Sequence, residues 1–259
     1  VLNTFGIPST ALGFIGGFTG EFIESTIKNE GIHTDFVKID KNSRINIKLK
    51  TGKETEINGQ GPLLTEKYIQ DLLTKLEALQ EGDILVLAGS IPASLPKTLY
   101  SDLTKMFSNR GVKVVVDAGG SVLAEVLQEK PFLVKPNHHE LSELFGVSIN
   151  TVEEVIPFGK KVVEMGAENV IVSMAGDGAL LFTNGKVYSA TVPKGKVLNS
   201  VGAGDSLVAG FIGTYSKDQD FMKAFQIAVA TGSATAFSQD LATKVKIDSL
   251  LNQVTVKEI

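Results

Sequence analysis

The sequence predicts an α/β fold in which a mostly parallel sheet is covered by helices on both faces. Two observations support this prediction. Short apolar runs, such as Asp83–Ala88 and Val112–Asp117, have the length and composition of buried strands. Helix-like segments such as Pro96–Asn109 separate them, and this alternation is typical of parallel sheets.

The remaining elements continue this alternation along the chain. Further strands are predicted at Ala11–Ile15, Phe132–Val134, Asn169–Ser173 and Ala179–Phe182. Further helices are predicted at Glu21–Glu30, Thr65–Gln80, His138–Phe145, Ser206–Tyr215 and Phe221–Ser238. The segment Thr65–Gln80 is amphipathic, because its leucines and Ile69 recur at helical spacing.

One segment departs from the alternation. Between Asp35 and Asn58, apolar residues alternate with polar ones around a turn signal at Thr51–Lys53. We predict an antiparallel sheet that forms a small lid over residues 35–58, inserted in an α/β domain of residues 1–34 and 59–259. An edge hairpin of the main sheet is the alternative.

The composition argues against several classes of protein. The chain has 259 residues and a formal net charge of −4, so it lacks the positive excess of a nucleic-acid-binding surface. Cysteine is absent, which excludes disulfides, thiolate zinc sites and cysteine nucleophiles. No apolar run reaches the roughly 18–20 residues of a membrane helix. We expect a cytoplasmic protein with neither nucleic-acid nor membrane partners.

Several common catalytic motifs are missing from the sequence. The dinucleotide-binding pattern G-x-G-x-x-G, the P-loop and the serine-hydrolase elbow G-x-S-x-G do not occur. The histidines, His33, His138 and His139, have no metal-ligand spacing. Dinucleotide oxidoreductases, P-loop ATPases, serine hydrolases and zinc enzymes are therefore disfavoured.

The stretch from Asn199 to Ser206 (NSVGAGDS) is the clearest chemical signal. A glycine-rich loop runs directly into a helix, so the N–H groups of Gly202, Ala203 and Gly204 can converge on an anion. An ionised Asp205 beside such a loop can accept a proton from an attacking hydroxyl. The structural alternative is an aspartate that caps the helix.

A second signal is Lys135-Pro-Asn-His-His-Glu140, which follows a predicted strand. Ligands of open α/β sheets bind at the carboxyl ends of strands, and the oxygens of Asn137 and Glu140 suit Mg²⁺, while Lys135 suits a phosphate. The alternative is a capping box, with Asn137 at the N-cap and Glu140 at N3.

Two further segments are compatible with a nucleotide site. The loop from Ser173 to Gly178 is rich in glycine, although a tight hairpin explains it equally well. The small side chains of Ala228–Ala236 permit close approach either by a flat base or by a neighbouring helix.

Taken together and in this order, the strand-end Asn-x-x-Glu, the glycine loop and the GAGD helix resemble the ribokinase-like sugar kinases of the phosphofructokinase B family. The resemblance spans essentially the whole chain, including the lid. It implies a three-layer α/β/α sandwich with a mostly parallel central sheet and a small β-sheet lid. It also implies that ATP and Mg²⁺ are required.

The resemblance also implies a role for each matching residue. Asp205 matches the catalytic base, and Gly202, Ala203 and Gly204 match the anion hole. Asn137 and Glu140 match the motif that governs Mg²⁺, the cation being held through water. The residues that match ATP contacts are Lys135, Asn137, Ser173, Gly176, Gly178, Asn199, Ser200 and Gly204. In the lid, Arg44 matches the arginine that binds the phosphate of a phosphosugar, although by itself it reads as a solvated strand residue.

Within the family, the segments SRINIKLK, EINGQGP, LAGSIP and KPNHHEL are most similar to those of bacterial 1-phosphofructokinases. This implies ATP-dependent phosphorylation of fructose 1-phosphate to the 1,6-bisphosphate. Tagatose-6-phosphate kinase is the alternative, and a non-catalytic sugar-phosphate or nucleotide sensor is a further one. The turn after Asp117 departs from the Thr-Ser-Gly type that the family leads us to expect.

The resemblance begins after the family's first strand and its Gly-Gly-Lys-Gly-x-Asn motif. We therefore expect about 45–50 residues to precede Val1 in a natural protein of about 300 residues. An exposed strand edge on the lid makes a homodimer through the lid the expected assembly.

Overall fold

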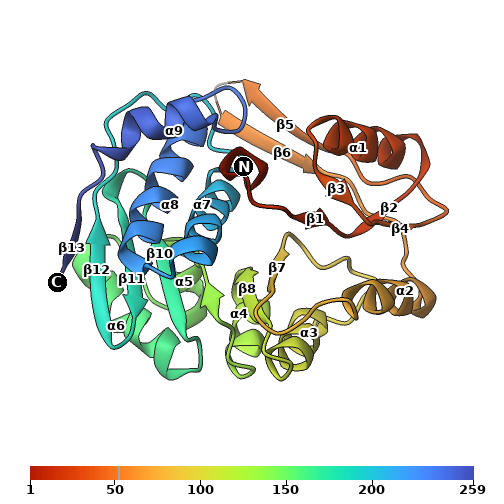
Figure 1. Cartoon of the computed structure of the whole chain (residues 1–259), viewed down its shortest axis with the longest axis horizontal. Coiled ribbons are helices and arrows are strands. Elements are labelled where there is room, and N and C mark those ends of the chain that lie inside the picture. The colour runs from red at the N-terminus through yellow and green to blue at the C-terminus, as the bar shows by residue number, and fades with distance from the viewer. Residues whose placement is uncertain (52) are drawn as a thin grey trace. The chain divides into compact units, whose positions relative to one another are not determined.

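A seven-stranded sheet organises the larger of two units into which the chain divides (Figure 1). The structure, a computed structural model, describes residues 1–51 and 53–259, without the side chains of residues 50–56. The first unit comprises residues 1–7, 80–90 and 98–259, and the second comprises residues 8–79 and 91–97. These contact boundaries differ from the functional division into domain and lid, which stays a prediction.

The sheet of the first unit is mostly parallel, as predicted. Its strands are β7 (Ile84–Ala88), β8 (Lys113–Asp117), β9 (Leu133–Val134), β10 (Asn169–Ser173), β11 (Ala179–Thr183), β12 (Lys186–Ala190) and β13 (Val256–Glu258). They lie in chain order across the sheet, from β7 at one end to β13 at the other. Neighbours from β7 to β10 pair in parallel, whereas β11, β12 and β13 each pair antiparallel with the preceding strand.

Helices cover both faces of this sheet. They are α3 (Leu99–Ser108), α4 (Gly120–Leu127), α5 (His138–Phe145), α6 (Val152–Glu164), α7 (Ala203–Asp218), α8 (Phe221–Ala236) and α9 (Lys244–Leu251). The side chains of Ile171 and Leu181 share a buried cluster with Phe211 of α7 and Phe225 of α8. Phe182, which points to the opposite face, packs against Gly159 of α6. The first unit is thus a three-layer α/β/α sandwich.

Helices α7 and α8 pack unusually close together. A methyl group on Gly210 would lie 2.7 Å from Thr231 Oγ1, and one on Gly232 would lie 3.0 Å from the Ala203 carbonyl oxygen. The small residues of Ala228–Ala236 therefore serve helix packing, which was one of the two interpretations of that segment.

The second unit contains short paired strands, an antiparallel hairpin and two helices. Its strands are β1 (Thr10–Ala11), β2 (Phe14–Ile15), β3 (His33–Thr34), β4 (Val37–Lys38), β5 (Asn46–Thr51) and β6 (Lys53–Asn58), and its helices are α1 (Gly17–Asn29) and α2 (Glu66–Leu76). Strands β5 and β6 form the predicted antiparallel hairpin, with Ile47 opposite Ile57. The centre of its predicted turn, residue 52, lies outside the described residues.

Two predictions about this unit were wrong. Ala11–Ile15 is not one strand, because β1 pairs with β3 whereas β2 pairs with β4. The antiparallel sheet does not extend over all of Asp35–Asn58, since β4 pairs in parallel with β2. In both places the pairing partner, which the local pattern does not specify, decides the structure.

In the first unit, the expected strand at Asp83–Ala88 is only half buried. Val86 retains 36% of its surface, and Ala88 is also exposed, because β7 ends the sheet. Helices α4, α6 and α9, strands β12 and β13 and the short 3₁₀ helix η1 (Asn3–Phe5) had not been predicted. Helix α6 contains Pro157 and Gly159, which locally argue against a helix.

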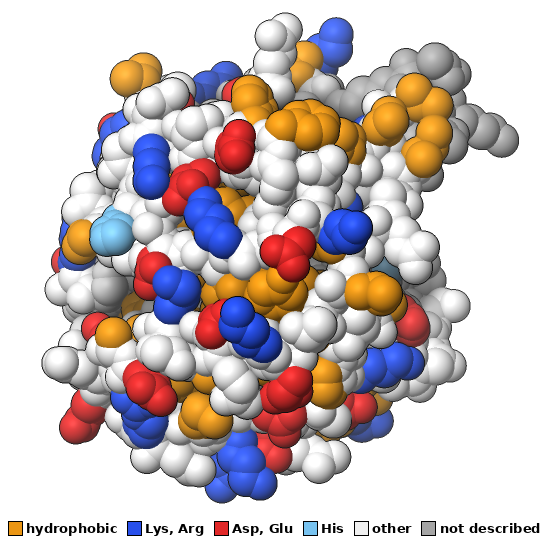
Figure 2. All heavy atoms as spheres, turned by 90° about the vertical axis from the view of Figure 1, so that its right-hand side faces the viewer, with side chains coloured by type: hydrophobic (Ala, Val, Ile, Leu, Met, Phe, Trp, Pro, Cys, Tyr) orange, Lys and Arg blue, Asp and Glu red, His pale blue; other side chains and the backbone are white. Residues whose placement is uncertain are grey.

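The surface and the helices bear on the expected partners. Within residues 1–51 and 53–259, no helix is long and apolar enough to cross a membrane. On the face drawn in Figure 2, basic and acidic side chains lie interspersed among the described residues, without a continuous basic patch. That face therefore lacks the electrostatic character of a nucleic-acid-binding surface.

The contact between α6 and β11 gives a stability test. A methyl group on Gly159 would lie 2.1 Å from the Phe182 ring, so Gly159→Ala should destabilise the protein by about 1–3 kcal/mol through overpacking. Helix propensity alone predicts the opposite sign, about 1 kcal/mol of stabilisation. Urea unfolding measures the difference, with the exposed neighbour Lys160→Ala as control. A stabilised Gly159→Ala would show that α6 does not pack on Phe182.

Candidate active site at the carboxyl edge of the sheet

The site forms where strands β8, β9 and β10 end. Because these strands are parallel, their carboxyl ends lie at one edge of the sheet, which is where open α/β sheets bind ligands. Asp117 ends β8, Lys135 follows β9, and Ser173 ends β10. The ladder continues past β9, because Lys135 N donates to Val116 O (3.2 Å) and Asn137 bridges to Ser173.

A buried ion pair joins two of these strand ends. Lys135 Nζ lies 3.1 Å from Asp117 Oδ1, and the two side chains retain only 6% and 15% of their exposure. Burial raises the pKa of Asp117, the ammonium of Lys135 opposes that rise, and the negative charges of Asp205 and Glu140 add to it. These four charged side chains therefore belong to one electrostatic cluster.

The start of α7 lies against the ion pair. A methyl group on Gly204 would be 3.2 Å from Lys135 Nζ, so the ammonium reaches the first turn of the helix. Gly202 caps the helix in the left-handed conformation (φ 76°), which glycine adopts at low cost. Its carbonyl oxygen accepts the N–H of Ser206 (2.8 Å).

The first turn of α7 offers free donors and an exposed carboxylate. The N–H of Ala203 donates to Ser200 O (3.2 Å), but those of Gly204 and Asp205 have no acceptor among the described residues. With the positive end of the helix dipole, they can hold an anion. The side chain of Asp205 is exposed at the same turn. A proton acceptor and an anion-binding turn thus lie side by side.

Asn137 and Glu140 form a complete capping box, the structural alternative considered for this motif. Asn137 Oδ1 accepts the N–H groups of His139 and Glu140 (both 2.9 Å), and Glu140 Oε2 accepts the N–H of Asn137 (2.8 Å). The cap occupies both lone pairs of Asn137 Oδ1 but only one carboxylate oxygen of Glu140. A methyl group on Gly119 would lie 3.1 Å from Oε1, so the glycine turn leaves room for this carboxylate.

The predicted nucleotide-contacting residues fall in two loops. Ser173, Gly176 and Gly178 belong to the hairpin between β10 and β11, where Ser173 neighbours Asn137. Packing alone explains a glycine at position 178, since a methyl group there would lie 2.4 Å from Ala190 O. In the loop before α7, Asn199 Nδ2 donates to Gln239 O (3.2 Å), and the carbonyl of Ser200 accepts from Ala203.

Arg44 belongs to the second unit, where its side chain is exposed just before β5. Its predicted role in binding phosphate therefore stays a prediction. Within the part of the chain that the structure describes, no group of three or more histidine or acidic side chains is arranged to hold a metal ion.

Asp117 is a site residue that the sequence motifs did not identify. The signal was present, because Asp117 ends a correctly predicted parallel strand, where ligand-binding side chains are expected. Its partner Lys135 is predicted from the sequence to bind phosphate. Asp117 and Lys135 are 18 residues apart, and this spacing does not indicate that they form an ion pair.

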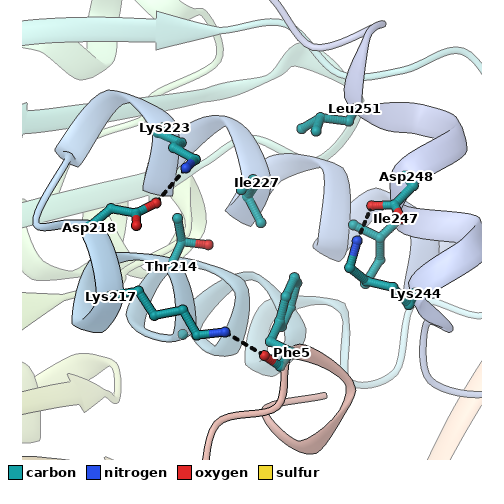
Figure 3. A pocket seen from close by; sticks show the side chains of 11 residues that line it. Phe5, Thr214, Lys217, Asp218, Lys223, Ile227, Lys244, Ile247, Asp248 and Leu251 are labelled. Carbon is teal, nitrogen blue, oxygen red and sulfur yellow. Dashed lines mark hydrogen bonds and ion pairs between the residues drawn. The ribbon is translucent and has the colours of Figure 1, made fainter.

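A hollow of about 200 Å³ in the first unit lies at the other end of α7 (Figure 3). Its floor is apolar. On its rim, Lys223 forms an ion pair with Asp218 (2.5 Å), and Lys217 Nζ donates a hydrogen bond to the carbonyl oxygen of Phe5 (2.7 Å). None of the predicted site residues lines it, so the carboxyl edge of the sheet remains the candidate active site.

Comparison with known proteins identifies the family of the chain. The model of the pfkB family carbohydrate kinases matches residues 1–247. The chain belongs to this family. The predicted enzyme class, a phosphotransferase with an alcohol group as acceptor, and the ribokinase-like fold are thereby confirmed, and ATP is the phosphoryl donor that a kinase of this family implies.

Individual relatives of this carbohydrate kinase match all or nearly all of the chain. It is 52% identical over 259 residues to the 1-phosphofructokinase of Bacillus subtilis, spanning 100% of this chain and 86% of that protein. It is 34% identical over 266 residues to a tagatose-6-phosphate kinase of Staphylococcus epidermidis, with the same coverage. The crystal structure of Escherichia coli phosphofructokinase-2 in complex with substrates and products superposes with a TM-score of 0.91 at 26% identity, covering 97% of this chain and 84% of that one.

The ion pair gives a test of the site's framework. Asp117→Asn would leave the ammonium of Lys135 buried without its partner, so it should reduce the free energy of unfolding by about 3–5 kcal/mol. The control is Asp248→Asn, which breaks the exposed pair with Lys244 and should cost about 1 kcal/mol or less. Chemical denaturation at pH 7 measures both. Equal, small effects would mean that Lys135 and Asp117 are solvated.

Proposed function

We propose that this kinase transfers the γ-phosphoryl group of ATP to fructose 1-phosphate, giving fructose 1,6-bisphosphate and ADP. The observation that carries the proposal is the exposed carboxylate of Asp205 on a helix turn with two open N–H donors. The acceptor is taken from the relative that is 52% identical, a 1-phosphofructokinase. Tagatose 6-phosphate is the alternative acceptor, because a tagatose-6-phosphate kinase is also a relative. It ranks second because that relative is only 34% identical to this chain.

Each residue of the cluster has a separate role in the proposed reaction. Asp205 accepts the proton of the acceptor hydroxyl as that oxygen attacks the γ-phosphorus and the bond to the β-phosphate oxygen breaks. The N–H groups of Gly204 and Asp205 donate to the transferring phosphoryl oxygens, where negative charge is spread in the transition state. The ammonium of Lys135, held against Gly204, adds positive charge at the same place.

A divalent cation fits one side of this cluster. Glu140 keeps Oε1 outside its capping box, in a cluster whose other carboxylates raise the local negative charge. Asn137 Oδ1 already accepts two N–H groups, so we assign Asn137 to positioning Glu140. Mg²⁺ keeps several waters and binds few protein carboxylates, and it neutralises phosphate charge when bound.

ATP and the sugar phosphate are assigned to different sets of residues. We assign the β10–β11 loop, with Ser173, Gly176 and Gly178, and the loop at Asn199–Ser200 to the nucleotide. We assign Arg44 to the phosphate already present on the acceptor, because a guanidinium matches phosphate geometry with two parallel hydrogen bonds. Both assignments rest on the family resemblance of these residues.

The β5–β6 hairpin supports the proposal of a homodimer through the lid. Four large aliphatic side chains of the hairpin region remain between 43% and 58% exposed, namely Ile45, Ile47, Leu49 and Ile57. Exposed apolar groups of this kind, alternating along a strand with open edges, favour association with a second copy. A cytoplasmic location follows from the proposed substrates, ATP and a sugar phosphate.

An acceptor panel tests the proposed reaction. ADP release is followed with fructose 1-phosphate, tagatose 6-phosphate, fructose or no acceptor, for the wild type and Arg44→Ala. We expect the highest kcat/KM with fructose 1-phosphate, and a loss of about 10–150-fold in Arg44→Ala, the worth of one charge-assisted contact. A higher kcat/KM with tagatose 6-phosphate would favour the alternative. ADP release that no acceptor stimulates would contradict the kinase assignment.

Glu140→Gln separates capping from cation binding. Glutamine at N3 still accepts the N–H of Asn137, so the melting temperature should stay near that of the wild type. The loss of a negative charge should raise the Mg²⁺ concentration needed for half-maximal turnover. Glu154→Gln, in the capping box of α6, is the matched control. An identical Mg²⁺ titration for both variants would leave Glu140 with the capping role alone.

A further inference from the structure

The hydroxyl of Tyr100 reaches the loop that follows β7. Tyr100 lies on α3 and is 8% exposed, and its Oη donates to Ala88 O (2.7 Å), with Gly89 O also within reach (3.2 Å). Ala88 and Gly89 are themselves exposed. A buried side chain thus anchors two carbonyl groups of an exposed turn.

This turn lies next to the carboxylate cluster. In the β7–β8 ladder Ala88 pairs directly with Asp117, which in turn pairs with Lys135. The strand order β7-β8-β9-β10 places the turn on the side of Asp117 that is away from the β10–β11 loop. With the nucleotide assigned to the β10–β11 loop, the turn after β7 lies on the acceptor side.

Gly89 brings no side chain that could hold the turn in place. Gly89 has a left-handed conformation (φ 84°), and a methyl group built on it would meet no atom within 4 Å. The chain also passes from the first unit to the second after Ser90 and returns at Thr98, two residues before Tyr100. The Tyr100 hydroxyl therefore holds together the two points where the chain leaves and re-enters the first unit.

We propose that Tyr100 is a positioning residue for the acceptor, which fixes the Ala88–Gly89 turn beside Asp117 through its hydroxyl. The effect on acceptor binding rests on the proposed kinase function. The hydrogen bond that fixes the turn does not depend on that function. Tyr100 touches neither substrate. It acts through the backbone of the turn.

The hydroxyl remains a donor over the working pH range. Burial, together with the negative charge of Asp117, raises the pKa of Tyr100 to about 12. The neutral phenol is therefore the form that faces the two carbonyl oxygens near neutral pH. A pH-dependent release of the turn is not expected below that value.

Tyr100→Phe removes the hydroxyl and keeps the ring. The matched control is Tyr188→Phe on β12, because Tyr188 is also 8% exposed and its hydroxyl has no hydrogen bond among the described residues. Two measurements are made on the wild type and both variants. The first is KM for the best acceptor in the panel and KM for ATP. The second is amide hydrogen exchange over residues 88–97.

We expect Tyr100→Phe to raise KM for the acceptor about fivefold, the effect of losing one ordinary hydrogen bond, with KM for ATP within about twofold of the wild type. Exchange at the turn should accelerate only in this variant. An unchanged acceptor KM, or equal rises in both KM values, would overturn the catalytic role. If the wild type phosphorylates no acceptor, the proposed function fails, and hydrogen exchange alone tests the role of Tyr100. Exchange rates at the turn that are equal in Tyr100→Phe and Tyr188→Phe would show that the Tyr100 hydroxyl does not hold the turn.

Discussion

The buried ion pair between Lys135 and Asp117 is the interaction on which the candidate site depends. It joins the carboxyl ends of β9 and β8, and its ammonium lies against Gly204 in the first turn of α7. Two charges can be kept inside a protein only when each satisfies the other, so neither residue can be replaced alone without a large cost. The pair thereby places a buried ammonium between the sheet edge and the helix that carries Asp205.

Other parts of the site are arranged around this pair. The capping box of α5 holds Glu140 within electrostatic reach of Asp117, and the glycines at 119 and 204 leave space for the charged side chains. Close packing of α7 on α8 through Gly210 and Gly232 sets the position of the helix start. The acidic side chains repel one another, and under the proposed function a cation that enters with the nucleotide relieves that repulsion.

Signals that are local in sequence allowed much of this to be predicted. The apolar runs identified β8 and β10, and the spacing of Asn137 and Glu140 identified the start of α5, because capping is decided within four residues. Helix α6 was missed because Pro157 and Gly159 are unfavourable locally, and only packing against Phe182 explains the glycine. The pairing of β1 and β2 with different strands, and the contact of Asp117 with Lys135, depend on neighbours far away in the chain, which a local pattern cannot specify.

The central claim is that the carboxylate at the start of α7 is the base of a phosphoryl-transfer site. The most direct measurement is single-turnover phosphorylation of fructose 1-phosphate by Asp205→Asn, with ATP affinity measured on the same sample. The account predicts a rate lower by about 10²–10⁴-fold, the usual contribution of a general base, with ATP affinity largely retained. A rate within about threefold of the wild type would contradict it, because Asp205 would then only begin a helix.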